Sequence, residues 1–242
     1  MAYREDSDLA FLKDCSSEDL DTLVQILTKD KDGNERLTEE LTTSERFKQH
    51  NPDHRVYWDT IAAEIQCYGA NTFATILRGG EGVLYKEVLI NACNKMKVNF
   101  NKNASVEIIE MNLLMKILTD SMEKMTPEEL QTLVEELDLK TTNFTKQAVV
   151  AAIQAGIKVG GFAAYKVAVI VANAVAKAVI GRGLSLAVGA GLTRSMAILA
   201  GPIGWAITAL WTLLDIAGPA FRITMPCVVQ VAFLRAKLKY KG

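Results

Sequence analysis

The chain has 242 residues, half of them hydrophobic, and a net charge of −1, so it can fill one large domain or two small ones. Its first ten residues, MAYREDSDLA, are acidic and lack an apolar core, which excludes a secretory signal there. Four scattered cysteines, at positions 15, 67, 93 and 227, form no CxxC pair and have no metal-binding spacing, which is typical of reduced thiols in a cytoplasm.

The small net charge conceals a strong asymmetry along the sequence. From Thr141 onward the chain carries 11 Lys/Arg and one Asp, a net charge of +10. The preceding 140 residues carry 16 Lys/Arg and 27 Asp/Glu, a net charge of −11. The two parts can neutralise each other within one fold. Alternatively, the basic part faces anionic lipid.

Residues 1–50 predict a small acidic helical module. Ser16 and the acids after it are typical of an N-cap, and they open a helix through about residue 27. The DKDGN sequence at 30–34 predicts a turn with a partial likeness to a calcium loop. With Gly33 at the sixth position of such a loop, Thr28 would be the first ligand and Glu35 would fill the eighth position, which is normally apolar. Both residues are unsuitable, so we expect no metal there.

Residues 51–140 predict an acidic, amphipathic helical region. Before it, a polar helix is expected over residues 38–49, ended by Asn51-Pro52. Further helices are expected over 54–67, around 73–77, over 83–95, from Ser105 to about 118, and over 126–137. Thr126 followed by Pro127 and two glutamates is the strongest start signal. Because strand-like alternation is nowhere sustained, the fold class is all-α.

Residues 146–180 form the longest periodic stretch and predict one helix. Its polar positions keep close to one line on the helix surface: Gln147, Gln154, Lys158, Tyr165, Lys166, Asn173 and Lys177. A helix with one thin polar stripe is expected to be buried around most of its circumference. Gly156 and Gly160 form a GxxxG step that would let another helix approach closely.

Residues 141–242 are basic, apolar and rich in glycine and alanine. Within them, 195–214 is a run of 20 uncharged residues, which just reaches the length of a spanning helix. Pro202 favours two shorter helices over one spanning helix, because proline disrupts a helix interior. Each half would then be shorter than the ~30 Å thickness of a hydrocarbon core. We therefore expect a multi-helix bundle around an apolar helical hairpin over residues 184–217, with residues 51–242 packed as one domain.

The sequence contains no recognisable catalytic arrangement. His50 and His54 are the only histidines, and Pro52 prevents them from sharing a helical face. No nucleophile and base pair, metal site or cofactor site is expected, so we predict a protein that is not an enzyme. The basic residues of the tail alternate with apolar ones, which argues against nucleic acid as a partner.

Several segments resemble one bacterial protein family. They are YREDSDLAFL at 3–12, DKDG at 30–33, RLTEEL at 36–41, IAAEIQ at 61–66, NTFAT at 71–75, LLMKILTD at 113–120 and GPIGWAI at 201–207. These segments resemble the YaaW-like proteins over nearly the whole chain. That family is grouped remotely with the mitochondrial ubiquinol–cytochrome c chaperones, which are helical assembly factors for a membrane complex. The resemblance implies a helical, non-enzymatic protein working near membranes, and it carries over no catalytic residues.

Three hypotheses follow. In the first, a cytoplasmic protein presents its hairpin to the inner membrane, associating with anionic lipid or inserting conditionally. In the second, a soluble assembly chaperone binds an apolar partner helix. In the third, the hairpin is simply the core of a plain soluble bundle. All three hypotheses are compatible with a homo-oligomer. Candidate membrane or partner contacts are Lys158, Lys166, Lys177, Arg182, Arg194, Trp205, Trp211 and Asp215.

Overall fold

The fold is that of a computed structural model, which describes residues 3–30, 32–36, 38, 40–69, 82–159, 161–181, 184 and 221–241. Within these residues every regular element is a helix. The β-type contact found there is an isolated antiparallel bridge between Lys29 and Glu35. The all-α prediction is therefore confirmed.

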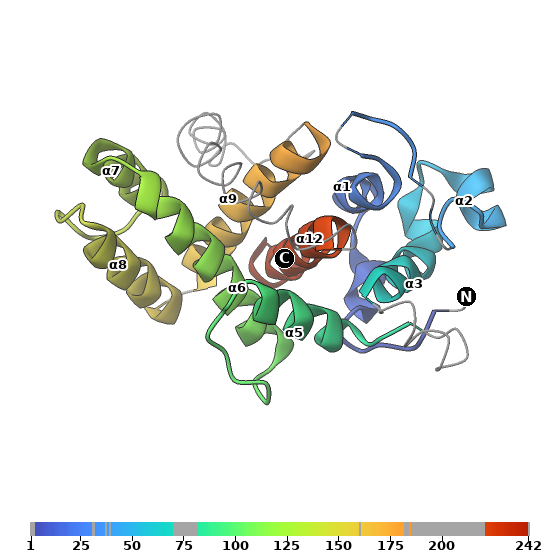
Figure 1. Cartoon of the computed structure of the whole chain (residues 1–242), viewed down its shortest axis with the longest axis horizontal. Coiled ribbons are helices and arrows are strands. Elements are labelled where there is room, and N and C mark those ends of the chain that lie inside the picture. The colour runs from blue at the N-terminus through green and yellow to red at the C-terminus, as the bar shows by residue number, and fades with distance from the viewer. Residues whose placement is uncertain are drawn as a thin grey trace.

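The α-helices are α1 (Ser17–Thr28), α2 (Glu45–His50), α3 (Trp58–Gly69), α5 (Tyr85–Lys95), α6 (Val106–Ser121), α7 (Pro127–Glu136), α8 (Lys146–Val159), α9 (Gly161–Ile180) and α12 (Phe221–Lys241). Short 3-10 helices cover Ala10–Asp14, His54–Tyr57 and Met122–Lys124. In Figure 1, α12 lies in the middle, with α1, α2 and α3 on one side and α7 and α8 on the other.

Two predicted helix starts are confirmed by their hydrogen bonds. Ser16 Oγ accepts the N–H of Asp19 at 3.1 Å, and the Asp19 carboxylate accepts the N–H of Ser16 at 3.3 Å. Thr126 and Glu129 make the same reciprocal pair at the start of α7, at 3.3 and 2.8 Å. Such a reciprocal pair, called a capping box, satisfies N–H groups that a helix start leaves without an intrahelical partner.

The polar helix predicted over residues 38–49 is wrong in its extent, because α2 begins only at Glu45. The preceding backbone is engaged elsewhere. The carboxylate of Glu64, fully buried in α3, accepts the N–H groups of Glu40 and Leu41 at 2.8 and 2.9 Å. Ser44 then caps α2 by accepting the N–H of Phe47. A tertiary contact thus replaces the first helical turns that the sequence favours.

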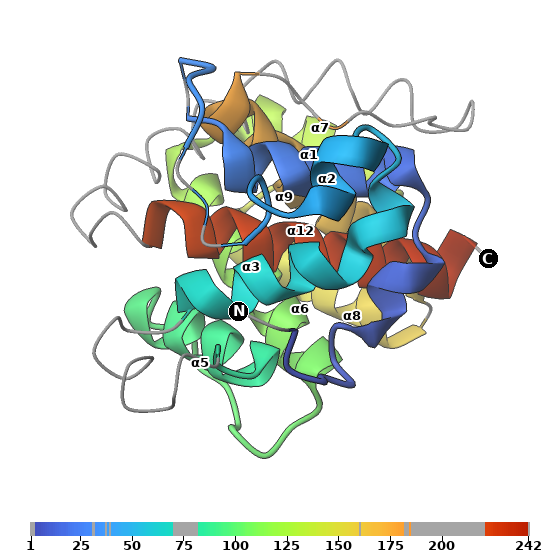
Figure 2. The same cartoon turned by 90° about the vertical axis from the view of Figure 1, so that its right-hand side faces the viewer.

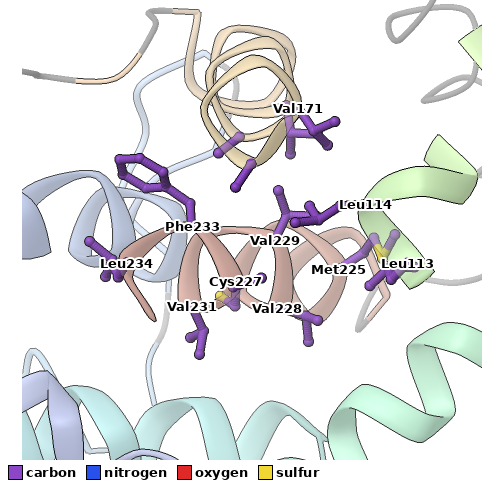
Figure 3. Packing of buried hydrophobic residues seen from close by; sticks show 14 of the residues in the cluster. Leu113, Leu114, Val171, Met225, Cys227, Val228, Val229, Val231, Phe233 and Leu234 are labelled. Carbon is purple, nitrogen blue, oxygen red and sulfur yellow. The ribbon is translucent and has the colours of Figure 1, made fainter. Parts of the chain in front are cut away.

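The core is organised around α12. Nearly every residue from Phe221 to Leu234 is buried, on all sides of the helix, because apolar residues occupy most positions around its circumference up to Arg235. Figure 3 shows Phe233 and Val229 on the side of α12 that faces α9, and Val228 and Val231 on the opposite side. The α12 helix therefore packs against α9 on one side and towards α3 and α5 on the other.

The prediction of one continuous helix over residues 146–180 is wrong. The chain forms α8 up to Val159 and a separate α9 from Gly161, and the two helices pack against each other. Glycine is a poor helix former, so the glycines at this junction favour a break. Packing also favours glycine at position 161, because a Cβ built there would overlap the ring of Tyr240 in α12.

The predicted apolar hairpin lies outside the described residues, apart from Leu184, as does the short helix expected around 73–77. Leu184 is buried, and its N–H donates to the side-chain oxygen of Asn173 at 2.9 Å. Among the described helices the central ones are α9 and α12, so the central place expected for the hairpin is not confirmed.

Candidate functional site

A pocket of about 540 Å³ opens where α6, the α8–α9 junction and the end of α12 meet. Its walls are mainly apolar, with charged groups on the rim. The lining residues are Glu107, Ile108, Glu110, Met111, Asn112, Leu114, Ile157, Lys158, Ala164, Ala232, Arg235, Ala236, Lys239 and Tyr240. In Figure 2, α12 crosses the middle of the view and its C-terminal end lies on the same side as α8.

A second hollow, of about 550 Å³, continues between α6 and α8. Its lining residues are Val98, Asn99, Met111, Asn112, Met115, Lys116, Thr119, Val150, Gln154, Ile157 and Lys158. The two hollows share Met111, Asn112, Ile157 and Lys158. Together they form one elongated depression, which we call the α6–α8 groove.

Two side-chain stripes give the groove its apolar character. On α6, Ile108, Met111 and Met115 follow each other at intervals of three and four residues, which places them on one helical face. On α8, Val150 and Ile157 lie seven residues apart, on one face as well. Ile108 is 55% exposed, while the other four are half-buried. The apolar side chains of the two stripes therefore line the groove and stay partly accessible to solvent.

The floor of the groove contains a buried polar network. Glu110, on α6, accepts hydrogen bonds from Nε of Arg235 at 2.9 Å and from the hydroxyl of Tyr85 at 2.8 Å. Arg235 also donates to the backbone oxygen of Asp8 at 2.5 Å, and its guanidinium lies 4.4 Å from the ring centre of Phe11. This network joins α5, α6, α12 and the N-terminal segment.

Burial sets the protonation behaviour of this network. Removal from water raises the pKa of Glu110 to about 7, although the positive charge of Arg235 and the hydrogen bonds from Tyr85 and Arg235 act in the opposite direction. Burial likewise raises the pKa of Tyr85 well above its usual range, with the neighbouring Glu110 charge adding to the effect. Both carboxylate oxygens of Glu110 have partners, so the residue acts as a structural tie.

The structure describes three of the residues that the sequence singled out. Lys158 and Lys177 are exposed and Lys166 is half-buried. Lys158 and Lys166 flank the α8–α9 junction, but Lys177 lies 11 residues further along α9, roughly 16 Å away. The other five, Arg182, Arg194, Trp205, Trp211 and Asp215, lie outside the described residues. Their contact with a membrane or a partner stays a prediction.

Sequence reasoning missed the groove, although a signal for it exists in α6. The apolar residues of this helix occupy two faces. Ile109, Leu113 and Ile117 are buried against the core, whereas Met111 and Met115 are left on the groove side. A helix more apolar than one core face requires is an indication of a second contact surface.

His54 and Asp30 both make structural contacts within the fold. His54 is buried, 2.5 Å from the Tyr57 hydroxyl and 3.4 Å from Asp21, and serves the packing of α1 against the His54–Tyr57 turn. Asp30 accepts the N–H groups of Asp32 and Asn34, which makes the predicted turn. In the part of the chain that the structure describes, no group of three or more His, Cys, Asp or Glu side chains is arranged to hold a metal ion.

Among the described helices, α9 is long and apolar enough to cross a membrane. Most of its apolar segment, 72%, is buried inside the protein, and the core helix of a soluble protein has the same character. Asn173, predicted to lie on its polar stripe, is buried and bonded within the fold. The length and composition of α9 are therefore not sufficient evidence that this helix spans a membrane.

Two family models match the sequence. One, described as a domain of unknown function (DUF3944), matches residues 3–37. The other, described as ubiquinol-cytochrome C chaperone, matches residues 53–230, which includes most of the groove. No solved structure matches the chain.

Several relatives align over almost the entire chain. A UPF0174 protein of Helicobacter pylori strain J99 is 50% identical over 238 residues, covering 98% of this chain and 94% of the relative. One of strain 26695 is 41% identical over 210 residues, covering 85% of this chain and 100% of the relative. The UPF0174 protein YaaW of Escherichia coli K12 is 31% identical over 239 residues, covering 96% and 95% of the two chains. The chain therefore belongs to the UPF0174 family of YaaW homologues, and most of its length matches the ubiquinol-cytochrome C chaperone family.

Proposed function

We propose that the protein is a non-enzymatic, chaperone-like factor of the cytoplasm that binds one apolar helix of a partner protein in the α6–α8 groove. The observation that carries this proposal is the groove itself, an open depression with apolar stripes on both walls. The description of the matching family as a chaperone supports the same role.

The dimensions of the groove suit a helix. From Ile108 to Thr119 it follows α6 for 11 residues, or roughly 16 Å, which is about three helical turns. An amphipathic or apolar helix commonly binds in such a groove through side chains on one of its faces. A partner of this kind would cover Ile108 and the half-buried stripes beside it.

The residue types favour a binder that accepts more than one sequence. Met111 and Met115 are unbranched and polarisable, so they can repack against differently shaped apolar side chains. Lys158 and Lys239 stand on the rim and remain in water. An apolar helix with polar ends therefore fits better than a uniformly charged one.

A binding measurement tests the proposal. The probe is a fluorescein-labelled leucine–alanine helical peptide with lysines at its ends, and the readout is fluorescence anisotropy with the full chain. Met115→Lys places a charge in the apolar wall, so we expect the affinity to fall about tenfold, or ~1.4 kcal/mol. Circular dichroism of the variant should show unchanged helicity.

A matched control separates the groove from general charge effects. Gln131→Lys makes the same change in charge on an exposed position of α7, outside the groove, and should leave the affinity unchanged. Equal binding by the wild type, Met115→Lys and Gln131→Lys would overturn the proposal, as would a wild type that ignores the peptide at every concentration. Sedimentation of the same samples reports the oligomeric state.

A further inference from the structure

The exposed large hydrophobic residues gather at one end of the molecule. Among the described residues they are Ile108, Val159, Phe162 and Leu238, with exposed fractions of 55%, 92%, 56% and 36%. Val159 ends α8 and Phe162 begins α9, one residue after Gly161, whose backbone touches the ring of Tyr240 near the end of α12. Ile108 lines the same pocket as Tyr240.

Lysines surround these apolar side chains. The ammonium of Lys166 lies 5.2 Å from the ring centre of Phe162, and that of Lys239 lies 5.3 Å from the ring centre of Tyr240. Lys158 is exposed next to Val159. Within the described part of the chain none of these three lysines forms an ion pair, in contrast to Lys116, Lys146 and Lys237.

The acidic groups nearby do not cancel this charge. Glu107 lines the pocket beside Lys239, and Glu110 is already paired with Arg235. The three lysines therefore leave an excess of positive charge at the end that exposes Val159 and Phe162. Protruding apolar side chains with cations around them are typical of proteins that bind at the surface of an anionic bilayer.

We infer that this end of the molecule, which we call the α8–α9 corner, rests on an anionic membrane surface. Val159 and Phe162 enter the headgroup region, and Lys158, Lys166 and Lys239 contact lipid phosphates. The pocket that begins the α6–α8 groove shares Lys158 and Lys239 with this corner, so the groove begins next to the lipid. A partner helix that moves between the groove and the bilayer would then expose few of its apolar side chains to water.

A second copy of the chain is a poorer occupant of this surface. In a two-fold symmetric dimer the same patch meets itself, so a contact through the corner would bring the three lysines close to their own copies. Like charges opposed in this way disfavour association. A lipid surface instead supplies the opposite charge and an apolar interior next to each other.

Co-sedimentation of the full chain with vesicles tests the inference. Vesicles of phosphatidylcholine with phosphatidylglycerol should bind the protein, those of phosphatidylcholine alone should bind it weakly, and added salt should release it. The triple variant Lys158→Gln, Lys166→Gln, Lys239→Gln should weaken binding at least about tenfold. The double variant Val159→Ser, Phe162→Ser should do the same without a change of charge.

The control is a triple variant of three exposed lysines elsewhere, Lys102→Gln, Lys124→Gln, Lys140→Gln, which loses the same charge and should bind as the wild type does. Equal weakening by both triple variants would overturn the inference, because it would show attraction by net charge alone. Absence of binding to anionic vesicles, or a dimer that the corner variants dissociate, would also overturn it. The double variant Val159→Ser, Phe162→Ser changes no residue that lines the groove, so it should leave peptide binding intact. Met115→Lys should leave vesicle binding intact, so the two proposals can fail separately.

Discussion

Glu110 and Arg235 are 125 residues apart in the chain, yet a 2.9 Å hydrogen bond joins their side chains between α6 and α12. The Glu110 side chain is 3% exposed and that of Arg235 15%. Because water cannot replace either partner, the pair fixes the position of α12 relative to α6, and with it the floor of the groove. The pair therefore links the stability of the core to the shape of the candidate site.

Removal of one member of this pair should be costly. Arg235→Met leaves the Glu110 carboxylate buried without its cation, and we expect a loss of ~3–5 kcal/mol in the free energy of unfolding, measured by urea denaturation. Lys116→Met breaks the more exposed pair with Asp120 and should cost less than about 1 kcal/mol. The double variant Glu110→Leu, Arg235→Met should recover part of the loss. Equal effects of Arg235→Met and Lys116→Met would contradict this account.

The same carboxylate predicts a pH dependence. The pKa of Glu110 is about 7 in the folded protein and near its ordinary value of 4.5 in the unfolded chain. Between these values the folded state binds the proton more tightly, so the contribution of Glu110 to stability is complete below about pH 4.5 and declines as the pH rises to about 7. Urea midpoints of the wild type relative to Glu110→Gln should follow this decline. A difference that does not vary with pH would show that the pair stays ionised throughout.

The cysteine thiols should be unreactive in the folded protein. Burial raises the pKa of Cys15 and of Cys93 to about 12, and that of Cys227 well above its usual range. At neutral pH these thiols carry almost no thiolate, which is the reactive form. Reaction with a disulfide reagent should therefore be slow at these three positions and fast after denaturation. Rapid modification of native Cys93, identified by mass spectrometry, would disprove their burial.

The capping box of α7 offers a test in a short helix near the groove. Thr126→Ala removes the acceptor of the Glu129 N–H, and we expect a loss of about 1 kcal/mol. Thr132→Ala, in the same helix, removes a hydroxyl that only bonds back to the Glu128 carbonyl, so its effect should be smaller. Thermal or urea unfolding followed by circular dichroism measures both. A larger effect at Thr132 would argue against the capping role.

Local features of this fold were predictable from the sequence. The starts at Ser16 and Thr126 depend on residues within one helical turn, so their hydrogen bonds follow from sequence alone. The all-α class follows from periodicity in the same way. The break after Val159 was not predicted, because alanine and valine continue on both sides of it and the glycines permit either outcome.

Features that depend on distant residues were not predictable. Nothing near Glu110 indicates that Arg235 will meet it, and nothing near Gly161 indicates the ring of Tyr240. The candidate site was therefore only partly predicted: Lys158 and Lys166 are among the contact residues that the sequence indicates, whereas Met111 and Met115 of α6 are not. The position of a groove depends on which apolar faces remain uncovered after packing, and a single sequence does not record that.

The central place of α12 has a consequence for synthesis of the chain. This helix follows all the other described helices in sequence, yet α1, α3, α5, α6 and α9 all pack against it. Until the ribosome has released residues 221–241, the apolar faces of those helices that pack against α12 stay open to water. Completion of the fold is therefore a late event, and a nascent chain stalled before α12 should be a target for degradation or for chaperones.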